Sequence, residues 1–230
     1  MLAAALHALR LVSARIAFYG GCVIVATFIQ AAIIVLWRAP QAIDVASAVV
    51  LPILSAVIYA FTANDARAEN AGPAQIWTRI LERTWAVIVI DFILNSIFAF
   101  GLASSDANAN IAGMIAGGLL LFLTAIFLFA DVSATVDDGD GTLLLIPRSV
   151  IRSVAAALYP GNMLGAIAIV SLELLLATLE GTLQQVLAAA HVPHPLLWAS
   201  VPLSTLAAVP ISAYTTLLYL RTQSKKPSAV

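Results

Sequence analysis

Long apolar stretches alternate with short polar segments along the whole chain. Six stretches are apolar enough to form membrane-spanning helices: 16–37, 42–61, 85–102, 111–130, 159–179 and 196–220. A helix needs about 20 predominantly apolar residues to cross the roughly 30 Å hydrocarbon core of a bilayer. The pattern predicts an all-α, polytopic membrane protein with six transmembrane helices. It forms one integral membrane domain over 1–230, with a tail at 222–230. Stretch 16–37 is too long for the apolar part of a signal peptide, so we expect it to remain as an anchor.

A basic but otherwise apolar segment precedes each odd-numbered span, at 5–15, 74–84 and 142–154. Arg79 and Arg83 are four residues apart, as are Arg148 and Arg152, so each pair shares one face of a helix. The apolar side chains of such helices sink into the headgroup boundary while the arginines stay near lipid phosphates. We therefore predict interfacial helices, with lipid contacts from these four arginines and from Arg10.

The spacing of the basic residues suggests an internal repeat. Arg10, Arg79 and Arg148 follow one another at 69-residue intervals, and the same offset aligns Ser55 with Thr124. This favours three repeated helix hairpins, at 5–73, 74–142 and 143–221, each preceded by an interfacial helix. The third copy aligns only after an insertion in the 180–195 loop. The alternative is that six spans of similar length produce the period by accident.

Composition and charge support a membrane location. Hydrophobic residues make up 62 % of the chain and charged residues 10 %, which excludes a soluble globule. A net charge of −1 offers no basic face for nucleic acid. If the six predicted spans cross a membrane, ten of the eleven basic residues fall on one side of it and only Arg38 falls on the other. Cytoplasmic loops retain Lys and Arg, so both termini are expected in the cytoplasm, with the protein in a bacterial-type inner membrane.

Polar side chains inside the spans are the main functional candidates. Glu173 lies near the middle of the fifth span, and Asp91 lies about two turns into the third. Asn95 is four residues beyond Asp91 and so shares its helix face. Gln30 is a further hydrogen-bonding group in the first span. A carboxylate at membrane depth is costly and faces the bundle interior. Two interpretations stay open: a structural hydrogen-bonding role and a functional one.

Small residues at helix-packing spacing occur twice, as Gly113 with Gly117 and as Gly161 with Gly165. Pairs of this kind let two helix backbones approach closely. We expect both pairs to mark tight helix contacts.

No metal, cofactor or catalytic site is predicted. The acidic glycine turn at 137–141 lacks the distal Glu and the spacing of a calcium loop, so Asp137 is expected in a solvated turn. His191 and His194 have no third ligand nearby. The single Cys22 excludes an intramolecular disulfide and is expected to pack as a small apolar residue.

Two stretches carry a family likeness. The first contains Phe127-Leu128-Phe129-Ala130-Asp131, then the acidic turn, then Arg148-Ser149-Val150; the second runs over 214–221 and ends in Tyr219-Leu220-Arg221. They resemble the membrane domain of bacterial glycerophosphoryl diester phosphodiesterases and its stand-alone six-span relatives. The acidic residue usual before the closing Leu is absent. The resemblance implies a six-span membrane domain, and the phosphodiesterase chemistry would belong to a separate soluble domain.

These observations favour a non-enzymatic membrane protein: a helix-packing scaffold, a partner or a lipid-organising subunit. The alternative is a small transporter or channel that uses Glu173 and Asp91. A lipid-handling enzyme is a third interpretation, but no residue supports it. Expected partners are membrane lipids and other membrane proteins or further copies of the chain.

Overall fold

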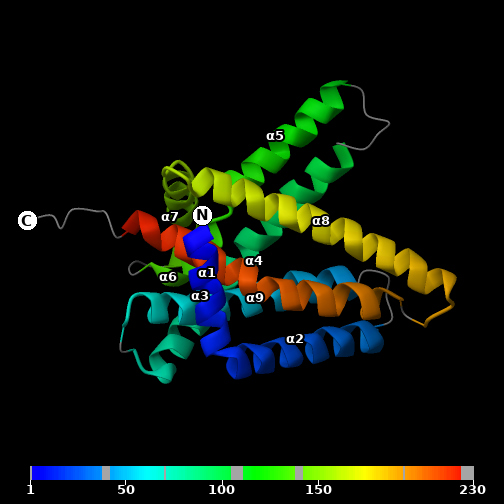
Figure 1. Ribbon diagram of the computed structural model, residues 1–230, viewed down its shortest axis with the longest axis horizontal. Helices are drawn as coiled ribbons and strands as arrows, with labels where there is room; N and C mark the ends of the chain where they lie inside the picture. Colours follow the sequence, from blue (N-terminus) through cyan, green and yellow to red (C-terminus); the bar gives the residue numbers. More distant parts are fainter. Residues whose placement is uncertain are drawn as a thin grey trace, which may run out of the picture.

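The computed structural model describes residues 2–37, 42–69, 71–104, 111–137, 142–193 and 195–223, and within these ranges it contains helices and no strand. The all-α prediction is confirmed. The helices are α1 (Leu2–Ala14), α2 (Ile16–Trp37), α3 (Ala42–Ala66), α4 (Pro73–Ser104), α5 (Ile111–Phe127), α6 (Ala130–Val136), α7 (Thr142–Ala157), α8 (Asn162–Ala189) and α9 (Pro195–Gln223) (Figure 1).

Five helical segments of the described chain are long and apolar enough to cross a membrane: Ile16–Trp37, Val45–Ala66, Gly113–Val136, Asn162–Ala189 and Leu197–Gln223. The remaining predicted span, 85–102, lies within α4, and several of its side chains fall outside the described residues. The structure is thus consistent with a membrane-helical bundle. The third predicted span, at 85–102, and with it the total of six spans, stays a prediction.

The long helices form three pairs, in which α2 packs with α3, α4 with α5, and α8 with α9. The two helices of each pair run in opposite directions (Figure 1). Helix α3 is central because it also contacts α4 and α9. Helices α1, α6 and α7 gather at one end of the bundle, the end with the termini, where α1 begins and α9 ends (Figure 1). This is the order expected of three hairpins; their sequence repeat stays a prediction.

Helices α3 and α9 run a few residues beyond the predicted spans 42–61 and 196–220, and larger differences occur elsewhere. Segment 74–84 is not a separate interfacial helix, because α4 runs without a break from Pro73 through the third span. The fourth span is divided by a turn at 128–129, after which α6 continues to Val136. The fifth begins later and ends later than predicted. Gly161 precedes it with φ 84°, and the helix ends before His191, which has φ 57°.

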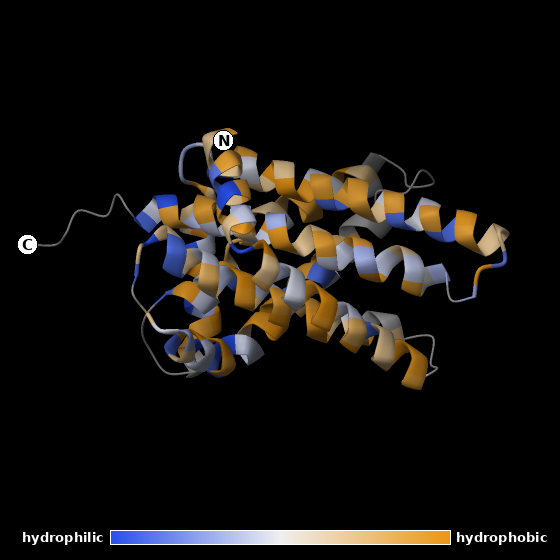
Figure 2. Cartoon of the chain, turned by 60° about the horizontal axis from the view of Figure 1, so that its bottom comes forward, coloured by the Kyte–Doolittle hydropathy of each residue, from blue (hydrophilic) through white to orange (hydrophobic). Residues whose placement is uncertain are grey.

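Apolar side chains fill the bundle and also cover its outer faces. Ile58, Val87 and Phe129 are fully buried, whereas Phe28 and Leu164 are exposed on the outside. Figure 2 shows hydrophobic residues along all the long helices, while hydrophilic ones are frequent at the end that carries the termini. Outer faces of this kind are suited to contact with lipid chains.

Candidate functional site

A partly open cavity of about 270 Å³ lies among the long helices. It brings together Asp91 of α4 and Glu173 of α8, two residues that the sequence singled out, and adds Asp131 of α6 and Glu180 of α8. Four carboxyl groups from three helices therefore line one cavity. Their convergence makes it the candidate site.

Asp91 is positioned by its neighbour on the same helix face. The Asn95 Nδ2 donates a hydrogen bond of 2.7 Å to Asp91 Oδ2, as their four-residue spacing predicted. Asn95 also lines the cavity. One carboxylate oxygen of Asp91 is thus held by α4 itself.

Asp131 differs from Asp91 because its buried carboxylate is not fully satisfied. The residue is 5 % exposed, and its Oδ1 has no hydrogen-bond partner among the described residues. Asp131 lines the same cavity as Asp91 and Glu173. A buried polar atom normally has a partner, so this oxygen is a candidate for ligand binding.

The turn between α5 and α6 places Asp131 at the cavity. The Ser153 Oγ of α7 donates to the Ile126 carbonyl over 2.9 Å and accepts from the Phe129 backbone N–H over 3.1 Å. These bonds satisfy backbone groups that the interrupted helix leaves open. The sequence prediction missed Asp131 because it ended the fourth span at residue 130. The apolar residues that follow Asp131, up to Val136, were the signal that could have included it.

Carboxyl, hydroxyl and apolar side chains line the cavity. Among the described residues that line it there is no Lys, Arg or His. Hydroxyl groups come from Ser55, Thr124, Ser204, Ser212 and Thr215, and aromatic rings from Tyr59 and Phe98. Carboxylates that share a site of low polarity repel one another, and protons or a cation relieve that repulsion. In the described part of the chain, no group of three His, Cys, Asp or Glu residues is arranged to hold a metal ion.

Gln30 lies apart from this cavity. It is fully buried on α2, and neither its Oε1 nor its Nε2 has a hydrogen-bond partner within the described ranges. Three residues earlier, Thr27 is hydrogen-bonded to Thr205 of α9 over 3.1 Å. The structure therefore brings together three of the four predicted intramembrane polar residues and leaves Gln30 outside the cavity.

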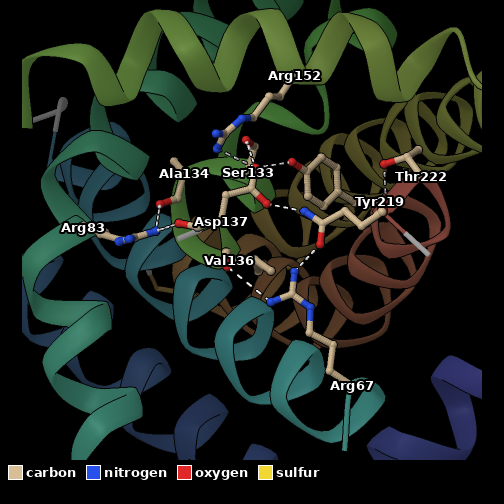
Figure 3. A network of polar contacts seen from close by, with 10 residues as sticks. Arg67, Arg83, Ser133, Ala134, Val136, Asp137, Arg152, Tyr219 and Thr222 are labelled. Carbon is tan, nitrogen blue, oxygen red and sulfur yellow. Dashed lines mark hydrogen bonds and ion pairs between the residues drawn. The ribbon is translucent and has the colours of Figure 1, made fainter. Parts of the chain in front are cut away.

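A second polar cluster surrounds Asp137 at the end of the bundle that carries the termini (Figure 3). Its carboxylate accepts hydrogen bonds of 2.8 Å from Ser133 Oγ and 2.9 Å from Arg152 Nη1. The Tyr219 hydroxyl and the Gln223 amide also donate to it. Asp137 is only 7 % exposed, so the predicted solvated turn is wrong for this residue. Asp138 and Asp140 lie outside the described residues.

Two further arginines bind backbone carbonyls where α6 ends. Arg83 Nη1 donates to the Ala134 carbonyl over 3.3 Å and to the Asp137 carbonyl. Arg67 Nη1 donates to the Val136 carbonyl over 3.5 Å (Figure 3). The last carbonyls of a helix lack partners within it, and cations are favoured there. The cluster thus connects α6 to residues of α4, α7 and α9 and to Arg67 just after α3.

The arginines predicted to meet lipid therefore divide into two groups. Arg83 and Arg152 direct hydrogen bonds into the protein, which the four-residue spacing alone did not reveal. For Arg10, Arg79 and Arg148 the lipid contact stays a prediction.

Another ion pair joins the start of α2 to the end of α3. Arg15 donates from Nη2 to Asp65 Oδ1 over 2.6 Å and from Nε to Asp65 Oδ2. The hydrogen bond to Asp65 raises the pKa of Arg15 above its usual value. This contact fixes the geometry of the first hairpin at the end that carries the other arginines.

The glycine pairs have different roles. A Cβ on Gly165 would lie 2.5 Å from Leu218 Cδ1, so this glycine allows α8 and α9 to approach closely, as predicted. Gly161 instead lies before α8 with φ 84°, a conformation that favours glycine, so its assignment to helix packing is wrong. Gly113 and Gly117 lie on α5, where Gly117 is buried. Cys22 is half-buried, and His191 is exposed; His194 lies outside the described residues.

Comparison of the chain with known protein families, curated proteins and solved structures found no match. The resemblance of two stretches to a phosphodiesterase membrane domain therefore stays a prediction.

Proposed function

We propose that this chain is a small transporter or channel that takes protons or a cationic solute into its acidic cavity. The observation that carries this proposal is the convergence of Asp91, Asp131 and Glu173 on one cavity without a basic residue among its described lining. We further propose that it has six spans in three hairpins, lies in a bacterial-type inner membrane and has no enzymatic activity.

The cost of buried charge favours this function over a scaffold. A carboxylate inside a spanning helix is costly, and on insertion scales a charged Asp costs up to about 2.5–3.5 kcal/mol, the value at the helix centre. A protein that only packs helices gains nothing from three such groups facing one cavity. A protein that binds a cation or exchanges protons needs them.

The interrupted fourth span provides independent support. Non-helical backbone at membrane depth is tolerated where it is buried in protein or lines a cavity. Leu128, in the turn between α5 and α6, lines the cavity, and Phe129 beside it is fully buried. Transporters often place their binding sites at such discontinuous helices.

Flux measurements on purified protein test the proposal. The protein is reconstituted into liposomes that contain a pH-sensitive dye, and proton movement is followed after a pH jump. We expect wild-type flux above that of protein-free liposomes. The variants Asp91→Asn and Glu173→Gln preserve shape but remove the exchangeable charge, so we expect each to lower the flux at least tenfold.

The matched control is Glu82→Gln, because Glu82 is exposed on α4 and is not part of the cavity lining. It should transport as wild type does. Folded Asp91→Asn and Glu173→Gln proteins with wild-type flux, or wild-type protein with no flux of protons or of any cation supplied, would refute transport. Either result would favour the scaffold, partner or lipid-organising role that the sequence suggested.

The proposed orientation rests on the arginines of the described chain. They belong to α1, α4, α7 and α9 and to the connections after α1 and α3, at the end that carries the termini (Figure 1). The positive-inside rule assigns that end to the cytoplasm. Reporter fusions at positions 70, 140 and 228 should give cytoplasmic signals, and fusions at 106 and 190 external ones. A cytoplasmic signal at 190 would contradict the six-span topology.

A further inference from the structure

We infer that the cavity binds a small organic cation that carries ammonium groups, and that a diamine fits it better than a monoamine. This inference rests on the proposed function and names its solute class. It follows from the unsatisfied Asp131 carboxylate, the placement of the other carboxylates and the apolar part of the lining.

The unsatisfied oxygen of Asp131 calls for a donor that the described protein does not supply. Its Oδ1 is buried and lacks a hydrogen-bond partner among the described residues, and Asp131 itself lines the cavity. An ammonium group has three N–H donors and no acceptor. It can therefore bind this oxygen and a neighbouring hydroxyl or carboxylate at once, in charge-assisted hydrogen bonds of about 2.7–2.9 Å.

A bare metal ion fits the same cavity poorly. Calcium takes about six to eight oxygen ligands at roughly 2.3–2.6 Å, and magnesium about six at still shorter distances. The carboxylates here come from different helices, and no three acidic, His or Cys residues of the described chain are grouped closely enough for metal coordination. An amine bridges carboxylates that are further apart because its carbon chain separates its charges.

The apolar lining suits the carbon chain of such a ligand. Leu94, Leu128 and Ile211 line the cavity together with the rings of Tyr59 and Phe98. An ammonium or its adjacent methylene groups bind favourably over an aromatic face. The volume of about 270 Å³ is below the roughly 300–1,000 Å³ of pockets for drug-sized ligands, so the ligand is small.

The distribution of carboxylates along the cavity favours two amino groups. Glu173 and Glu180 are seven residues apart on α8 and share its cavity face. At about 1.5 Å per residue, their backbones are about 10 Å apart along the helix. Asp131 and Glu173 line the cavity together, and Glu180 lines it two helical turns further along α8, so carboxyl groups are present at two levels of the cavity. A ligand with an ammonium group at each end can bind Asp131 and Glu173 with one group and Glu180 with the other.

Binding measurements in detergent test this inference directly. Isothermal titration of purified full-length protein compares putrescine, butylamine, butanediol, potassium and magnesium as chloride salts where charged. We expect putrescine to bind more tightly than butylamine, and butanediol not to bind. Removing a charged partner of a buried hydrogen bond commonly weakens binding about tenfold or more, so Asp131→Asn should weaken putrescine by at least that factor. Glu82→Gln should bind as wild type does.

A second variant covers the case in which Asp131→Asn fails to fold. Glu180→Gln changes a half-buried carboxyl at the other level of the cavity. This variant should reduce the preference for putrescine over butylamine, while its affinity for butylamine should stay within about twofold of the wild-type value. Size-exclusion profiles and thermal unfolding confirm that each variant is folded.

Three outcomes would overturn the inference. One is tight binding of potassium or magnesium without any heat from amines; another is equal binding of butanediol; the third is unchanged putrescine affinity in folded Asp131→Asn and Glu180→Gln proteins. Proton flux that depends on Asp91 and Glu173 but is unaffected by putrescine would leave the transporter proposal intact while refuting the amine. Absence of both flux and cation binding would refute the transporter proposal itself.

Discussion

The close approach of α8 and α9 at Gly165 should make this position intolerant of a single added methyl group. A Cβ there would lie 2.5 Å from Leu218 Cδ1 and 3.4 Å from the Tyr214 hydroxyl oxygen. Optimal separations between carbon atoms are about 3.5–4.0 Å. Leu218 is fully buried, so its side chain has little free space into which it can turn.

The expected magnitude follows from two opposing effects. Overpacking a well-packed core typically costs about 1–3 kcal/mol. Replacing Gly by Ala in a helix interior contributes about 1 kcal/mol in the opposite direction. Gly181→Ala is the matched control, since it lies on the same helix and its Cβ would meet no atom of the described structure within 4 Å. Gly165 lies in the first turn of α8 and Gly181 in its interior, so the propensity gain at Gly165 is no larger than at Gly181. Gly165→Ala should therefore be less stable than Gly181→Ala by about 1–3 kcal/mol.

Equilibrium unfolding of the purified protein in mixed detergent micelles measures this difference. The double variant Gly165→Ala/Leu218→Ala separates the clash from other effects, because shortening Leu218 removes the group that the new methyl would meet. The double variant should be more stable than the sum of the two single changes predicts. Gly165→Ala protein at least as stable as Gly181→Ala would show that the two helices do not pack this closely.

Three further changes test the polar contacts, each followed by thermal unfolding with Glu82→Gln as the exposed control. Asp137→Ala should lower the free energy of unfolding by about 3 kcal/mol, because it leaves several buried donors without their acceptor. A loss no larger than that of Glu82→Gln would show that these donors do not depend on Asp137. Arg15→Gln should cost no more than about 1 kcal/mol, since its ion pair with Asp65 is partly exposed, and the loss should shrink in high salt. Ser153→Ala should cost about 1–2 kcal/mol through the two backbone groups it satisfies; no loss would show that the turn before α6 holds without it.

The sequence by itself determined the features that depend on neighbouring residues. The length of an apolar run decides whether a helix can span a bilayer, and the predicted first span has the bounds of α2. Residues four apart share a helix face, so the contact of Asn95 with Asp91 followed from spacing alone. The small residue at Gly165 likewise indicated a close helix contact.

Tertiary structure decided which helix faces meet. Periodicity defines a face on one helix but not the helix that packs against it, so the sequence could not show that Asp131 joins Asp91 and Glu173 in one cavity. The same limit applies to Asp137. It follows an apolar run and begins an acidic glycine turn, so its neighbours alone predict a solvent-exposed residue. Its burial results from donors far away in the chain, such as Tyr219, which only the packing of α9 against α6 brings near.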